Sequence, residues 1–293
     1  MKSKILIITG SNGYILRDFN FDKFSSEYYI YYFHKKNHKK TKNHFQYDEV
    51  SKLENFIKNE SIKSIKFISF GSHLGGHDPK LYFESILNLE KILNLINNSG
   101  KECIIYHASS FSTFNPTKNS SIFPLSIGFL PDHRGPYSFS KSKQDNLIKK
   151  YCFSNKKIKS KIIYLGHVHS IDNDLLSRFT PRSFSLGNIV ISFIYSPFKL
   201  INPISKENIH HYIKTFLEHK KYLYENIEYK FLTDSGSPKS LFRIFLENNK
   251  LFISPIAPIV CTFIGLIFCF TRENSNLRFY LAKFLQMNNS IRI

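Results

Sequence analysis

The sequence has 293 residues, of which 42% are hydrophobic, and it carries a formal net charge of +19. This is enough apolar material for the core of one large domain, or of a domain with a smaller lobe, and it excludes a disordered chain. The charge suits nucleic acid, a membrane surface or an anionic small molecule, but no zinc-finger spacing or helix-turn-helix pattern accompanies it, so we expect no nucleic-acid partner.

The cysteines and the first residues both bear on the compartment. The four cysteines form no C-x-x-C pair, which favours a reducing environment, and no carboxylate or cysteine at suitable spacing completes a metal site with His73 and His77 or with His167 and His169. The apolar run in MKSKILIITG is too short for a signal peptide. We therefore expect a cytoplasmic protein.

The first predicted strand, residues 4–9 (KILIIT), ends in a glycine turn. Thr9, Gly10 and Gly13 stand where a dinucleotide-binding turn lets the backbone approach a pyrophosphate at the N-terminus of a helix. Leu16 occupies the position at which a third glycine would allow close packing of helix and strand. An ordinary turn between a strand and a helix is the alternative explanation.

The second predicted strand, residues 28–33 (YYIYYF), is followed by His34, Lys35 and Lys36. An acidic residue here would bind the ribose hydroxyls of NAD, whereas these basic side chains would attract the 2′-phosphate of NADP. The pattern favours NADP over NAD, with a solvated basic loop as the alternative.

Apolar strands and helical patterns continue to alternate through the first half of the chain. Further strands are predicted at residues 65–70 (IKFISF), 103–108 (CIIYHA) and 161–166 (KIIYLG). Helices are predicted from the apolar spacing in residues 50–57 and 89–96, the second ending at Gly100. This alternation predicts an α/β fold, a Rossmann-type doubly wound parallel sheet covered on both faces.

Two hydroxyl residues and a tyrosine–lysine pair are the candidate reactive groups. Ser109 and Ser110 follow the strand at residues 103–108, at the sheet edge that faces ligands in such folds. Tyr137 and Lys141 are four positions apart, so they share one helix face, and the lysine ammonium can favour the ionised form of the phenol. A solvated helix in a lysine-rich chain is the alternative.

After about residue 170 the alternation weakens. A helix is predicted after Ser205, and residues 228–233 (EYKFLT) predict another strand. We expect an NAD(P)-binding Rossmann domain at residues 1–170, completed by parts of 200–235, and a smaller substrate lobe at 171–293.

An apolar segment near the end, residues 251–270, carries no charge over twenty positions, which is long enough to cross a bilayer as a helix. Pro255 and Pro258 interrupt its first half, so an interfacial segment or a buried, dimer-forming helix are the alternatives. Basic residues flank it on both sides, which favours an interfacial position. We expect peripheral contact with the inner face of the cell membrane, and we keep a homodimer open.

Six stretches together resemble the extended short-chain dehydrogenases/reductases, the NAD-dependent epimerase/dehydratase family. They are TGSNGYI, FISFGSH, LNLEKILNLINNSG, HASSFSTF, PYSFSK and YLGHVHS, in the family's order and at roughly its spacing, over about residues 3–235. The resemblance implies a Rossmann domain that holds NADP or NAD, and a C-terminal lobe that holds a nucleotide-sugar or ketosugar substrate.

The resemblance also implies roles for single residues. Tyr137 corresponds to the catalytic acid/base, Lys141 to its partner and ribose ligand, and Ser110 to the hydroxyl that positions the substrate. The implied cofactor-binding positions, besides Tyr137 and Lys141, are Thr9, Gly10, Asn12, Gly13, Tyr14, Ile15, Lys35, Phe70, Gly71 and Ser72. The implied substrate-binding positions are Asn88, Ser110 and His167.

The implied reaction is hydride transfer between a sugar carbon and the nicotinamide, with Tyr137 moving the hydroxyl proton. Sugar 4,6-dehydratases of the family follow the serine with an Asp-Glu pair, whereas this chain has Phe111 and Ser112. Dehydration is therefore disfavoured, which leaves an epimerase or a ketosugar reductase of surface glycan biosynthesis. The alternative is a catalytically silent nucleotide-binding scaffold at a membrane assembly, which departures such as Leu16 would suit.

Overall fold

The computed structural model describes residues 2–35, 43–72, 79–113, 135–169, 183–186, 189–193, 200–218, 225–234, 239–240, 251–253 and 267. The chain divides into two compact units. The first unit comprises residues 1–110, 140–164 and 208–231, and the second comprises residues 111–139, 165–207 and 232–293.

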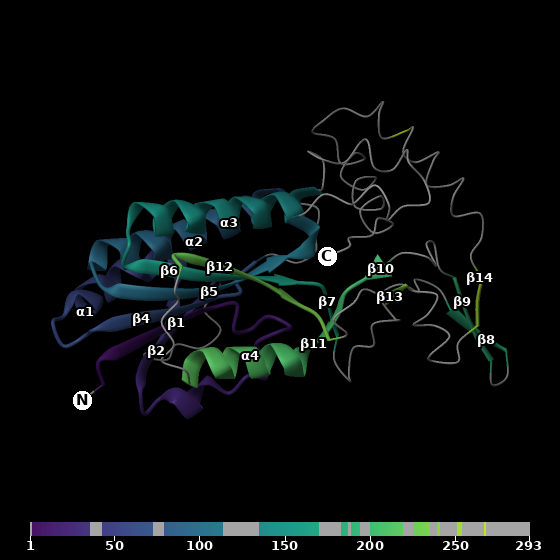
Figure 1. Ribbon diagram of the computed structural model, residues 1–293, viewed down its shortest axis with the longest axis horizontal. Helices are drawn as coiled ribbons and strands as arrows, with labels where there is room; N and C mark the ends of the chain where they lie inside the picture. Colours follow the sequence, from purple (N-terminus) through teal and green to yellow (C-terminus); the bar gives the residue numbers. More distant parts are fainter. Residues whose placement is uncertain are drawn as a thin grey trace. The chain divides into compact units, whose positions relative to one another are not determined.

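The first unit is built on a seven-stranded sheet with the order β12-β6-β5-β4-β1-β2-β3 (Figure 1). Its strands are β1 (Lys4–Thr9), β2 (Tyr28–His34), β3 (His44–Gln46), β4 (Ser64–Ser69), β5 (Glu102–Ser110), β6 (Ile158–Leu165) and β12 (Ile227–Leu232). The pairings from β3 across to β5 are all parallel. Because β1 lies between β2 and β4, the strand order reverses beside it, and ligands of such sheets bind at that switch point.

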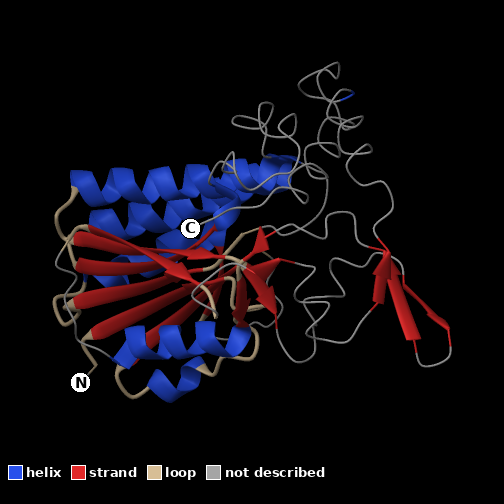
Figure 2. Cartoon of the chain, turned by 45° about the vertical axis from the view of Figure 1, so that its right-hand side comes forward, coloured by secondary structure: helices blue, strands red, loops and turns tan. Residues whose placement is uncertain are grey.

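The core explains why this sheet carries helices on both faces. Ile5, Leu6, Ile7 and Ile8 of β1 are fully buried, so both faces of the strand need an apolar cover. Helices α2 (Pro79–Ser99) and α3 (Gly135–Ser154) cover one face, and α4 (Lys206–Glu218) with the 3₁₀ helix η1 (Phe21–Phe24) covers the other (Figure 2). The predicted doubly wound α/β fold is confirmed.

The predicted helices differ in how regular they are. The helix expected to stop at Gly100 does so, with Gly100 at φ +65° after α2. The helix expected over residues 50–57 is instead a 3₁₀ helix, η2 (Tyr47–Leu53), followed by the short α1 (Glu54–Lys58).

The helix expected after the first glycine turn is absent, although residues 10–27 are all described. The chain makes a turn in which Arg17 N donates to Gly13 O at 3.0 Å, and it then enters η1. Leu16 is buried in the core, and the Nε2 of His210 on α4 donates to Ile15 O at 2.6 Å. The burial of Leu16 and the hydrogen bond from His210 therefore hold this turn. Because residues 10–20 form no helix, this segment directs no helix dipole toward the carboxyl end of β1.

The second unit contains short strands in small sheets. They are β7 (His167–His169), β8 (Ser183–Leu186), β9 (Ile189–Phe193), β10 (Leu200–Ile201), β11 (Pro203–Ser205), β13 (Lys239–Ser240) and β14 (Leu251–Ile253), with the 3₁₀ helix η3 (Phe111–Thr113). β7 pairs with β11, β10 with β13, and β9 with both β8 and β14.

Of the apolar segment at residues 251–270, the structure describes β14 and Ile267, and the remainder lies outside the described residues. Its first three residues pair in parallel with β9 and so form a strand. None of the described helices combines the length and the apolar character needed to cross a membrane.

Candidate functional site

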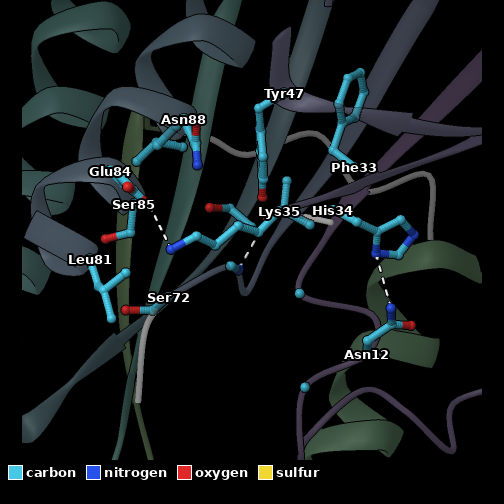
Figure 3. Close-up of a pocket in the computed structure, with 16 residues that line it drawn as sticks. Asn12, Phe33, His34, Lys35, Tyr47, Ser72, Leu81, Glu84, Ser85 and Asn88 are labelled. Atoms are coloured by element: carbon cyan, nitrogen blue, oxygen red, sulfur yellow. Dashed lines mark hydrogen bonds and ion pairs between the residues drawn. The ribbon is translucent and has the colours of Figure 1, made fainter. Parts of the chain in front are cut away.

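A cavity of about 340 Å³ opens at the carboxyl edge of the sheet in the first unit (Figure 3). The strand register explains its place, because Thr9 of β1 lies opposite Phe33 of β2 and Ser69 of β4. Its lining comes from the ends of these strands, the turn after β1, the residue after β3 and one face of α2. The lining residues are Thr9, Gly10, Asn12, Gly13, Phe33, His34, Lys35, Tyr47, Ser69, Gly71, Ser72, Leu81, Glu84, Ser85, Asn88 and Leu89.

The floor of the cavity depends on Gly10. This residue has φ +78°, and a Cβ there would lie 2.6 Å from the carbonyl carbon of Phe70. The neighbouring Gly71 N donates to Thr9 Oγ1 at 3.1 Å, which ties the end of β4 to the end of β1. A glycine is therefore required at position 10, where the chain leaves β1 and lies against the residue that follows β4.

An ion pair crosses the cavity from β2 to α2. Lys35 Nζ lies 2.5 Å from Glu84 Oε2, and both side chains are about half exposed (Figure 3). Beside it, His34 Nδ1 lies 3.3 Å from Asn12 Nδ2, and His34 Nε2 lies 2.8 Å from His44 Nδ1. The basic end of β2 thus faces the cavity as expected, but Glu84 offsets the charge of Lys35; Lys36 lies outside the described residues.

One side of the cavity is a face of α2 that the sequence interpretation only partly recognised. Asn88 was expected near the substrate, and it lines the same cavity as Gly10 and Gly13 of the turn after β1. Leu81, Glu84 and Ser85 share its helix face because they precede it by seven, four and three positions. That spacing was the signal that could have found them.

Tyr47 was also missed, because it follows a strand of only three residues, β3. Its hydroxyl would lie 3.0 Å from a Cβ on Gly71, so the side chain borders the cavity beside the residues that follow β4. Burial raises the pKa of Tyr47, and a hydrogen bond with Thr9 opposes that rise only in part. Tyr47 is therefore a neutral wall of the cavity.

The tyrosine–lysine pair lies on α3, with Tyr137 half-buried one turn before Lys141. Lys141 is 3% exposed, and its Nζ donates to Ala108 O of β5 at 2.6 Å. Burial lowers the pKa of Lys141 to about 8, although the charge of Asp145 raises it. The lysine is thus anchored against the strand that carries the two serines.

The two serines at the end of β5 have different surroundings. Ser109 is buried, and its Oγ donates to Asp145 Oδ2 of α3 at 2.7 Å. Successive side chains of a strand point to opposite faces, so Ser110 projects to the other side and is partly exposed. Ser110 is thus the more exposed of the two serines.

The cavity therefore brings together about half of the residues expected to form the site. Inside its lining are Thr9, Gly10, Asn12, Gly13, Lys35, Gly71, Ser72 and Asn88. Outside its lining are Tyr14, Ile15, Phe70, Ser110, Tyr137, Lys141 and His167. His167 belongs to β7 of the second unit, where its backbone N donates to Asn202 O at 2.8 Å.

No protein-family model matches the chain, and the search of curated proteins found no match. Solved structures do match. MoeE5 in complex with UDP-glucose and NAD is 14% identical, with a TM-score of 0.57 over 85% of each chain. UDP-N-acetylglucosamine 4-epimerase from Bacillus cereus is 10% identical, with a TM-score of 0.57 over 98% of this chain and 99% of the other.

A third match is a short-chain dehydrogenase/reductase superfamily protein from Agrobacterium tumefaciens with bound NAD. It is 13% identical, with a TM-score of 0.59 over 85% of this chain and 84% of the other. At these identities the likeness concerns the fold, and it agrees with the strand order and with the cavity at the switch point. The chain has the fold of the extended short-chain dehydrogenases/reductases that its motifs resemble.

Proposed function

We propose that the chain is an NAD(P)-dependent enzyme that transfers hydride to or from a nucleotide-sugar or ketosugar. The observation that carries the proposal is the cavity itself. The Gly10 turn, the end of β4 and the Asn88 face of α2 enclose one space at the switch point of a doubly wound sheet. The matched structures that bind NAD and UDP-glucose support the same ligand classes.

The cofactor would lie along the strand ends, with its pyrophosphate over the Gly10 turn and its adenosine beside Lys35. Thr9, Asn12, Gly13, Gly71 and Ser72 would line it. When bound, its nicotinamide accepts or donates the hydride. We propose NADP as the preferred form, because Lys35 would bind a 2′-phosphate in place of Glu84.

The reacting groups would be Ser110, Tyr137 and Lys141. Tyr137 would take the proton of a sugar hydroxyl during oxidation, or return it during reduction, while Ser110 holds the sugar oxygen. The Lys141 ammonium, one turn from Tyr137, would favour the phenolate and bind the cofactor ribose. Phe111 and Ser112 supply neither the acid nor the base that dehydration needs, so we propose an epimerase or a reductase.

The second unit would hold the sugar nucleotide, with His167 of β7 among its ligands. We propose that the protein works in the cytoplasm in surface glycan biosynthesis, with peripheral membrane contact through residues 251–270. Phe83 and Leu87 of α2, both 56% exposed, suggest where a second copy would pack in a homodimer.

The test of the reaction is Tyr137→Phe. We expect turnover with a panel of nucleotide-sugars and ketosugars to fall by orders of magnitude while dinucleotide affinity stays near that of the wild type, because the lost hydroxyl transfers a proton. Tyr151→Phe is the matched control, since it removes a hydroxyl from the same helix where Tyr151 bonds Asn94, and it should retain turnover. Equal inactivity of the wild type and Tyr137→Phe with the whole panel would favour the scaffold instead.

A further inference from the structure

A cluster of buried polar side chains joins α3 to the centre of the sheet beneath Lys141. Asp145 of α3 is 4% exposed, and its Oδ2 accepts from Ser109 Oγ at 2.7 Å. Its Oδ1 lies 3.2 Å from His107 Nε2 of β5, and His107 Nδ1 lies 3.0 Å from Ser69 Oγ of β4. A buried carboxylate is costly unless donors or a cation compensate it, and beside the Ser109 donor a positive charge would stabilise it further.

His107 does not supply that charge. It is fully buried, and burial lowers its pKa, as does the positive charge of Lys141, against the opposing effect of Asp145. A neutral imidazole can direct its Nε2–H toward Asp145 and accept from Ser69 at Nδ1. Tyr164 of β6 also faces Asp145, and burial raises its pKa, so it stays uncharged.

Lys141 is the remaining cation. It lies one helical turn before Asp145 on α3 and is almost fully buried. Its hydrogen bond to Ala108 O is made to an uncharged carbonyl, which does not balance the ammonium. The charge of Asp145 acts on this ammonium, and the Ser109 hydroxyl ties the same carboxylate to the strand that ends in Ser110.

We propose that Asp145 is a positioning residue that keeps Lys141 cationic and holds α3 in register with the end of β5. The proposal rests on the proposed function in one respect, namely that Lys141 serves Tyr137 and the cofactor. With Asp145 present, Lys141 remains charged at neutral pH despite its burial. Without the Asp145 charge, burial would lower the pKa of Lys141 unopposed and favour the neutral amine.

The test is Asp145→Asn, a replacement of nearly equal shape that removes the charge. Lysine side-chain NMR titrations of the full chain, with Lys141→Arg used to assign the resonance, should show the pKa of Lys141 falling by about one unit or more. The alkaline limb of the turnover profile should move down by a similar amount, and kcat should fall more than KM rises. An unchanged Lys141 titration in folded Asp145→Asn would overturn the proposal.

Ser109→Ala is the matched control, because it removes a hydrogen bond from Asp145 but leaves the charge. It should leave the Lys141 titration close to that of the wild type, and a fall as large as in Asp145→Asn would contradict a role for the charge. If Asp145→Asn does not fold, Asp145→Ser, a smaller polar residue that also removes the charge, takes its place, and an unchanged Lys141 titration in that variant would overturn the proposal. These titrations need no substrate, so they stand apart from a failure of the proposed reaction, which would show as absent turnover with normal titrations.

Discussion

Lys35 and Lys141 show how burial decides what one residue type can do in this chain. Lys35 is half exposed beside Glu84, so their ion pair contributes little to stability. An anionic ligand can therefore replace Glu84 as the partner of Lys35. Lys141 is enclosed, with a pKa lowered to about 8, so its charge depends on its surroundings. Motifs identified both lysines but not their partners. Glu84 lies 49 residues from Lys35, and the Ala108 carbonyl that binds Lys141 lies 33 residues from it, separations at which sequence spacing carries no information.

The pair of Lys35 and Glu84 makes cofactor preference testable with two opposite changes. Lys35→Ala should weaken NADPH binding about tenfold and leave NADH nearly unchanged, because only the 2′-phosphate would lose a charged partner. Glu84→Gln should strengthen NADPH binding, since the phosphate no longer displaces a carboxylate. Isothermal titration measures both, with Lys91→Ala on the exposed face of α2 as the control for charge alone. The preference for NADP would be rejected if the protein bound NADH at least as tightly as NADPH and Lys35→Ala changed neither affinity.

At the scale of elements, the buried strands were predictable and the short ones were not. β1, β2, β4 and β5 are apolar runs bounded by polar turns, and each lies where the pattern placed it. β3 and the strands of the second unit have two to five residues, too few for a period to appear. The helix expected after β1 does not form: Leu16 is buried in the core, and His210 of α4 donates to Ile15 O of the turn, a contact between residues 195 positions apart that spacing cannot reveal.

Gly10 and Gly100 offer a matched test of the close approach between the residues that follow β1 and those that follow β4. Both have positive φ, but a Cβ on Gly10 would collide with the backbone of Phe70, whereas a Cβ on Gly100 would meet nothing within 4 Å. Gly100→Ala should cost about 1 kcal/mol of unfolding free energy, from backbone strain alone. Gly10→Ala should cost at least about 2 kcal/mol and abolish dinucleotide binding. Urea denaturation compares the two, and equal losses would mean that the close approach contributes nothing.

For the whole molecule, charge and apolar surface point to the same kind of partner. The net charge of +19 would attract an anionic membrane as well as an anionic substrate. The apolar run at residues 251–270 lies between basic flanks, Lys239, Arg243 and Lys250 before it and Arg272, Arg278 and Lys283 after it. Ile267, within that run, is 38% exposed.

Vesicle sedimentation tests whether these features bind a membrane surface. The full chain should sediment with vesicles containing anionic lipid and much less with neutral vesicles, because the basic flanks need negative headgroups to oppose them. High salt should release a protein held mainly by charge, whereas a segment that also buries apolar side chains should be released only in part. Ile267→Glu should weaken the salt-resistant fraction without affecting dinucleotide affinity, and Lys91→Ala serves as the control for a single change in charge. A full chain that stays in the supernatant with every vesicle composition would reject membrane contact, and the excess positive charge would then act only on soluble anions.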